Sequence, residues 1–157
     1  MEDHRRFMLE AIRLSEEGMT LGHGGPFGAV VVKDGEIIGR GFNRVLSSND
    51  PTAHAEVTAI RDACKNLSSF QLTDCIIYTS CEPCPMCMGA IYWARPKAVY
   101  YANNRNDAAE IGFDDDFIYT EIAQPLENRK LPMIQVLRDE ALLPFKRWQE
   151  NNSKTLY

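Results

Sequence analysis

The N-terminal part of the chain predicts a helix followed by a β-hairpin. Apolar residues recur at helical spacing over residues 3 to 17, and Gly18 is expected to end that helix. The apolar run from Phe27 to Val32 is typical of a buried strand. Asp34-Gly35 is a hairpin turn signal, so Glu36 to Phe42 is expected to return beside that run as a second strand.

Helices and strands then alternate along the rest of the chain. The expected elements are a helix over 52–66 with Asp50 as N-cap and Pro51 at its first position, a strand over 75–79, a helix from near Pro83 to about Ala94, a strand over 97–102, a strand over Met133 to Leu137, and a last helix containing Phe145 and Trp148. Strands separated by helices imply crossover connections and a largely parallel sheet covered on both faces. We therefore predict an α/β fold over residues 1–157, a single domain built as a three-layer α/β/α sandwich with a mixed five-stranded sheet.

The composition is that of an ordinary globular protein. The chain has 157 residues, 45% of them hydrophobic and 25% charged, and can bury a core without disulfide bonds. Its longest apolar runs span about a third of the ~20 residues that a membrane helix needs, so no membrane partner is expected. The charged, amphipathic N-terminus lacks the pattern of a secretory signal, and we expect a cytoplasmic protein.

The charge distribution argues against a polynucleotide substrate. The formal net charge is −5, and the longest local basic groups are pairs such as Arg5-Arg6 and Lys146-Arg147. A nucleic-acid binder usually carries a basic stripe. The charge thus favours a small-molecule substrate, although a basic patch assembled in three dimensions stays open.

The cysteines point to a metal or to catalysis. In the cytosol the five cysteines would stay reduced, and three of them fall within Cys81–Cys87. Their C-x-x-C-x-x-C spacing resembles an iron–sulfur run, but the fourth position of that run is Ile91. An iron–sulfur site would also leave His54 and Glu56 without roles, so it is the weaker interpretation.

Two segments together form the H-x-E and P-C-x-x-C signature of zinc nucleobase deaminases. We predict one zinc ion per chain, bound by His54, Cys84 and Cys87, with water or hydroxide as the fourth ligand. The two cysteines share one face at an expected helix start, where the helix dipole favours thiolates. Glu56 lies about 200° around the helix from His54 and suits a general acid/base better than a ligand.

At these residues the chain resembles the cytidine-deaminase-like superfamily, and within it the bacterial-type guanine deaminases. The resemblance runs nearly the whole length. The segments that carry it are Gly24–Ala29, Ser48–Arg61, Tyr78–Cys87, Gly89–Val99, Gly112–Asp115 and the terminal Tyr157. It implies hydrolysis of guanine to xanthine and ammonia at the C2 amino group, by an enzyme acting on a C–N bond.

The resemblance also implies further site residues. Asn43 would hydrogen-bond the purine edge, and Phe27 and Trp93 would pack on the ring. Asp115 would bind the base and shuttle protons beside Glu56, with its neighbour Asp114 as the alternative. Tyr157 would close over the pocket.

Enzymes of this kind form homodimers, some of which exchange the C-terminal helix and tail, here about residues 139–157. Four other functions stay open: a guanosine deaminase, a tRNA adenosine deaminase, a cytosine or cytidine deaminase, and a non-catalytic zinc protein. The last would need a fourth protein ligand and would not need Glu56. The sequence assigns no role to Cys81.

Overall fold

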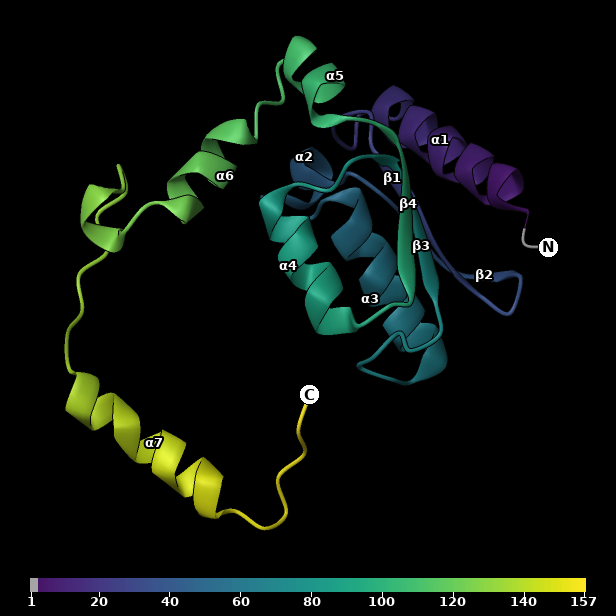
Figure 1. Ribbon diagram of the computed structural model, residues 1–157. Coiled ribbons are helices and arrows are strands. Elements are labelled where there is room, and N and C mark those ends of the chain that lie inside the picture. The colour runs from purple at the N-terminus through teal and green to yellow at the C-terminus, as the bar shows by residue number, and fades with distance from the viewer. Residues whose placement is uncertain (1–2) are drawn as a thin grey trace. The chain divides into compact units, whose positions relative to one another are not determined.

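The Asp34-Gly35 turn joins two antiparallel strands, β1 (Gly28–Lys33) and β2 (Glu36–Phe42), as predicted. In the computed structural model, which describes residues 3–157, these strands belong to a four-stranded sheet with the order β2-β1-β3-β4 (Figure 1). β3 (Ile76–Cys81) pairs antiparallel with β1, and β4 (Ala98–Asn103) pairs parallel with β3. The sheet is mixed, as expected, but two of its three pairings are antiparallel rather than parallel.

The prediction of a fifth strand over Met133–Leu137 is wrong. This segment has no strand pairing with any described residue, and Ile134 and Val136 are 83% and 73% exposed. A strand exists only through the backbone hydrogen bonds of a neighbour and the packing of one face. The β-branched residues of this segment therefore do not suffice to make it a strand.

Contacts within the chain divide it into two compact units, the first ending at Asp116 and the second covering Phe117–Tyr157. The second unit contains most of α6 (Asp116–Ala123), the short 3-10 helix η1 (Leu126–Asn128), and α7 (Arg138–Glu150). α7 holds the two aromatic residues that the sequence places in the last helix. A single domain over the whole chain stays a prediction.

In the first unit, helices cover both faces of the sheet (Figure 1). Because side chains alternate along a strand, β1 serves two cores. Val30 packs in a cluster with residues of α1 (His4–Thr20), whereas Val31 packs with residues of α3 (Ala55–Leu67) and α4 (Pro85–Ala94). The predicted three-layer α/β/α arrangement is therefore confirmed for this unit.

The prediction that Gly18 ends the first helix is wrong, because α1 continues to Thr20. A Cβ atom at position 18 would lie 2.7 Å from the ring of Phe42. The glycine is therefore a packing residue, which lets the helix approach the end of β2. Its low helix propensity alone does not stop a helix that is packed on a sheet.

One edge of the sheet collects the segments that carry the candidate chemistry. The register pairs Gly28 with Phe42 and Cys81 with Asn103, so the start of β1 and the ends of the other three strands meet there. The short helices α2 (Val45–Ser48) and α5 (Arg105–Glu110) follow β2 and β4 at this edge. Among the described residues, no helix combines the length and apolar character needed to cross a membrane.

Candidate active site

A pocket of about 400 Å³ opens at this edge of the sheet. It is lined by residues that precede β1, by the β2–α2 junction, by the start of α3, by the β3–α4 loop and by residues that follow α5. The predicted site residues in its lining are Phe27, Asn43, His54, Glu56, Cys84 and Asp115. Segments far apart in sequence thus bring most of the predicted site together.

His54 and Cys84 each stand immediately before a helix. His54 is the N-cap of α3 and Cys84 is the N-cap of α4, where its Sγ accepts a hydrogen bond from the backbone N–H of Cys87 at 3.5 Å. The first N–H groups of a helix are free and its dipole is positive at this end. Both side chains therefore start at the positive end of a helix, and at Cys84 this position stabilises a thiolate.

Both helices begin later than predicted. Asp50 does not cap a helix that starts at residue 52, because its carboxylate accepts hydrogen bonds from the backbone N–H and the hydroxyl of Thr52, at 2.8 and 2.7 Å. This local turn holds Pro51 and Thr52 outside α3. In α4 the first helical residue is Pro85 rather than Pro83, which is equally compatible with a missing N–H.

The three predicted metal ligands lie together. Their ligand atoms are all within 4.8 Å of one another, and His54 Nδ1 lies 3.5 Å from the Sγ atoms of both Cys84 and Cys87. Two ligands of a tetrahedral zinc ion, bound at roughly 2.0–2.3 Å, are about 3.5 Å apart. No fourth His, Cys, Asp or Glu joins this group in the part of the chain that the structure describes. The donor set therefore fits zinc in a site that keeps one position open, as catalytic zinc sites do.

The contacts among the ligands favour a thiolate at Cys84. The pKa of Cys84 is lowered to about 4, mainly by a hydrogen bond with the Cys87 side chain and also by His54, while burial opposes the change. The same sulfur–sulfur contact, together with burial, raises the pKa of Cys87 far above its ordinary value. The hydrogen bond with Cys84 also raises the pKa of His54.

Glu56 is buried beside the ligands without belonging to them. It is 5% exposed; its Oε2 lies 3.3 Å from Cys87 Sγ, and its Oε1 accepts a hydrogen bond from the Thr79 hydroxyl at 3.1 Å. Burial raises the pKa of Glu56, while the hydrogen bonds from Cys87 and Thr79 oppose that rise. A carboxyl with a raised pKa next to a metal site can both take up and release a proton near neutral pH.

Asn43 is buried where β2 ends, and its amide is oriented by the backbone. The side-chain Oδ1 of Asn43 accepts a hydrogen bond from the backbone N–H of Val45 at 3.1 Å. The backbone N–H of Asn43 donates to the backbone oxygen of Phe27 at 3.0 Å. The glycine-rich segment lies directly against this amide, because a Cβ at Gly24 would be 2.1 Å from Asn43 Oδ1. With its oxygen engaged in this way, the side chain offers its NH₂ group as a hydrogen-bond donor in the pocket wall.

Asp114 and Asp115 both line the pocket, but they differ in their contacts. Asp114 Oδ1 accepts the backbone N–H of Asp116 at 3.1 Å and so is engaged at the start of α6. Burial raises the pKa of Asp115, and the charge of Cys84 adds to the rise. Asp114 is thus engaged by a local backbone contact, whereas Asp115 is the half-buried member of the two.

Trp93 and Tyr157 are exposed, and Cys81 is a buried residue outside the ligand group. Trp93, on α4, is 63% exposed and is not among the residues lining the pocket, and Tyr157, in the C-terminal unit, is 67% exposed. The roles of both stay predictions. Cys81 lines the pocket but is not in the ligand group; its Sγ lies 3.8 Å from Asn104 O, and burial raises its pKa to about 11.

Residues that the sequence interpretation did not single out also shape the site. Thr79 holds Glu56, and its signal is a polar side chain that directly follows the apolar start of a strand. Glu82 and Phe113 line the pocket, and Arg105 binds Glu82. Glu82 and Phe113 lie in segments that carry the family resemblance, but their spacing assigns them no role, and Arg105 lies outside those segments. Only the folded chain brings Glu82 and Phe113 to one pocket and Arg105 to Glu82.

The sequence matches the family described as the cytidine and deoxycytidylate deaminase zinc-binding region over residues 1–103. It is 61% identical to the guanine deaminase of Bacillus subtilis over 155 residues, which cover 99% of each chain. It is 42% identical over 106 residues to a tRNA-specific adenosine deaminase of Streptococcus pyogenes, covering 67% of this chain and 66% of that protein.

Solved structures give the same picture. The X-ray structure of the Bacillus subtilis guanine deaminase superposes with a TM-score of 0.96 and covers 99% of both chains. A guanine deaminase from Nitrosomonas europaea superposes with a TM-score of 0.69 at 32% identity, covering 73% of this chain and 66% of that one. Another related chain, with a TM-score of 0.70 and 32% identity, was solved in complex with 2,6-diaminopurine; 73% of this chain and 64% of that one are covered.

Proposed function

The chain belongs to the family described as the cytidine and deoxycytidylate deaminase zinc-binding region, and within that family to the guanine deaminases. On this basis we propose that it hydrolyses guanine to xanthine and ammonia. The observation that carries this function is the placement of Glu56 beside the group of His54, Cys84 and Cys87, two of which, His54 and Cys84, line the same pocket as Glu56. A pocket of about 400 Å³ is within the range that small-molecule substrates occupy.

His54, Cys84 and Cys87 would hold one zinc ion per chain. When bound, the ion supplies a water of lowered pKa as the nucleophile. The protein's part is to keep two sulfurs and one imidazole nitrogen at the spacing the metal needs. The cap position of Cys84 and the backbone N–H of Cys87 fix one of these sulfurs before any metal arrives.

Glu56 would move the protons of the reaction. Its carboxylate takes a proton from the attacking water and delivers it to the departing amino nitrogen as the C2–N bond breaks and the C2–O bond forms. One water and one guanine are thereby converted to one xanthine and one ammonia, so atoms and charge balance. Thr79 holds Oε1, whereas Oε2 lies beside the sulfur of Cys87, so Oε2 would be the oxygen nearer the metal and the one that exchanges protons.

Asn43, Asp115 and Phe27 would select the base. The Asn43 NH₂ donates to an acceptor on the purine edge, and the Asp115 carboxylate accepts from the donors of guanine. Adenine lacks the N1–H and 2-amino donors, so it would leave the half-buried Asp115 carboxylate unpaired and be rejected. Phe27 offers an apolar ring in the pocket wall, against which the flat base packs.

The remaining parts of the proposal concern assembly and location. We propose a homodimer in which residues of about 139–157 exchange between subunits, with Trp93 and Tyr157 completing the purine site. The exposed aromatic side chains of Tyr92 and Trp93 on α4 support an apolar partner surface. A cytoplasmic location is supported by five free cysteines, and a small purine rather than nucleic acid as substrate is supported by the net charge of −5.

Ammonia release from guanine, guanosine, adenine and cytosine tests this function. We expect turnover of guanine by the zinc-loaded protein and none by its Glu56→Ala variant. Turnover mainly of guanosine would keep the mechanism and change the substrate. Release from none of the four, with zinc bound, would overturn the function and favour an adenosine in tRNA. That alternative rests on the 42% identity to the tRNA-specific adenosine deaminase, which matches 67% of this chain rather than 99%.

A further inference from the structure

The residues around Asp115 are poorly covered by the rest of the first unit. Phe113, Asp114 and Asp116 are exposed, and Asp115 is the one half-buried member of this run. A loop of this kind moves unless it is tied to the scaffold, and a misplaced acid loses the contact on which it acts. The structure contains two ties, one on each side of Asp115.

The first tie is the ring of Phe113. It meets the ring of Phe27 edge-on, with centroids 4.9 Å apart and planes at 89°. Its backbone N–H donates to Ala108 O at 3.0 Å, which turns the chain back from the end of α5. Gly25 provides the space, because a Cβ there would lie 2.8 Å from the tip of the Phe113 ring. The segment is thereby fastened to the pocket wall before Asp115.

The second tie is Arg105. Its backbone N–H donates to Glu82 Oε2 at 2.9 Å, and its Nε and Nη2 donate to Glu82 Oε1 at 3.2 and 3.0 Å. Its Nη1 lies 3.8 Å from Asp116 Oδ1. Arg105 therefore connects the β3–α4 loop, two residues before Cys84, with the residue after Asp115. The pair is partly buried, at 38% and 22% side-chain exposure, so it is more rigid than a free surface pair.

We propose that Arg105, clamped by Glu82, is a positioning residue that holds the Asp115 carboxylate at the pocket, with Phe113 as the second anchor of the same segment. This role rests on the proposed function, since it acts through the contact of Asp115 with the purine. The charges agree with it. The Arg105 cation lowers the pKa of Asp115, whereas burial and the charges of Cys84 and Glu82 raise it. Loss of Arg105 would therefore weaken the attachment of the segment around Asp115. It would also remove the cation that lowers the pKa of Asp115 and so favours its ionised form.

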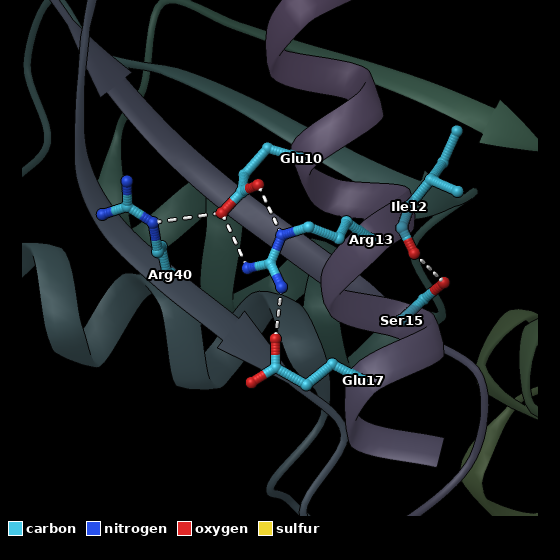
Figure 2. Close-up of polar contacts among 6 residues, drawn as sticks. All are labelled: Glu10, Ile12, Arg13, Ser15, Glu17 and Arg40. Atoms are coloured by element: carbon cyan, nitrogen blue, oxygen red, sulfur yellow. Dashed lines mark hydrogen bonds and ion pairs between the residues drawn. The ribbon is translucent and has the colours of Figure 1, made fainter. Parts of the chain in front are cut away.

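The test compares Arg105→Gln with Arg13→Gln in the zinc-loaded protein. Arg13 is a matched control, because it also makes two hydrogen bonds to one carboxylate, that of Glu10, and lies outside the pocket (Figure 2). We expect Arg105→Gln to lower kcat/KM for guanine by about tenfold to hundredfold, with zinc content and Tm like those of Arg13→Gln. Arg105→Lys, which keeps the charge but not the fork, should recover part of the loss.

A double-mutant cycle separates positioning from a merely structural role. If Arg105 acts through Asp115, Arg105→Gln should change kcat/KM less than about twofold in an Asp115→Asn background. Binding of 8-azaguanine, measured by calorimetry in a zinc-loaded Glu56→Ala background, should show the same lack of additivity. Additive losses, loss of zinc, or unchanged kcat/KM and binding in Arg105→Gln would overturn the role. A wild-type protein that binds 8-azaguanine without releasing ammonia from guanine would instead refute the proposed function, and the binding cycle would still test Arg105.

Discussion

The Oε2 atom of Glu56 lies 3.3 Å from the Sγ atom of Cys87, so a buried carboxyl contacts a candidate metal ligand without belonging to the ligand group. Glu56→Ala should therefore leave zinc binding intact while removing the group that transfers protons. We expect kcat to fall by about two to four orders of magnitude. Metal content by atomic emission and ammonia release measure the two effects separately. Turnover close to that of the wild type would refute the acid/base role.

Thr79→Val should weaken the site without removing any reacting group. Valine keeps the shape of threonine but cannot donate to Glu56 Oε1, which leaves a buried carboxyl oxygen short of one partner. A hydrogen bond to a charged group contributes roughly 1.5–3 kcal/mol, so kcat/KM for guanine should fall by about tenfold or more. Thr73→Val, at an exposed position, is the matched control. Equal kcat/KM in both variants would show that the Thr79 hydroxyl has no part in holding Glu56.

Cys84→Ala should abolish stoichiometric zinc. It removes one of three ligands and also the cap of α4, so the remaining imidazole and thiol no longer enclose an ion. Cys64→Ala is the control, because Cys64 is a free, half-buried thiol packed against the core and outside the ligand group. One zinc per chain in purified Cys84→Ala would contradict the ligand assignment.

Glu10→Gln should reduce stability in a pH-dependent way. The hydrogen bond from Arg13 lowers the pKa of Glu10 in the folded protein, and Arg40 contributes (Figure 2). A lowered folded pKa gives stabilisation that is present above the ordinary pKa of about 4.5 and is lost as pH falls through the folded value. Because Arg13 is 55% exposed and screened by solvent, we expect a loss of about 0.5 kcal/mol at pH 7.

Urea unfolding at pH 7 and at pH 3 measures this effect, with the wild-type protein beside the variant at each pH. The difference in unfolding free energy should shrink at the lower pH, and it should also shrink in 0.5 M salt. A difference that is equal at both pH values would place its origin in packing rather than in the charge of Glu10.

Deletion of Thr155–Tyr157 should lower kcat/KM for guanine if the terminal tyrosine closes over the bound purine. Tyr157→Phe separates the ring from its hydroxyl and should retain most of the activity if stacking is what matters. Full kcat/KM after the deletion would reject the lid and leave Asn43, Phe27 and Asp115 as the purine contacts.

The grouping of the candidate metal ligands could be predicted from the sequence because these residues lie at fixed short spacings. His54 with Glu56, and Cys84 with Cys87, each lie within one helix start, where local geometry determines their placement. The exact start was not readable, because the Asp50–Thr52 turn and a thiol cap compete with the proline signals. Local spacing thus predicts the ligands better than the helix boundaries.

Long-range features were harder to predict. Val136 and its neighbours have strand-like residues but no strand partner within residues 3–157. Gly18 lies inside a helix because the ring of Phe42 occupies the space that a side chain would need. The hydrogen bonds of Arg105 to Glu82 join residues 23 positions apart, and the local sequence around either residue does not predict this contact. Such contacts depend on the register of β3 against β4, which side-chain patterns do not specify alone.

Both N-cap ligands also have a mechanical consequence. His54 and Cys84 are 30 residues apart and begin different helices, so an ion held between them fastens two helix ends to each other. Bound zinc would therefore act as a reversible cross-link that closes a long loop of the chain, as a disulfide does. Its stabilising effect would depend on the concentration of free zinc rather than on redox conditions. Metal starvation should then shorten the lifetime of the folded protein as well as silence it.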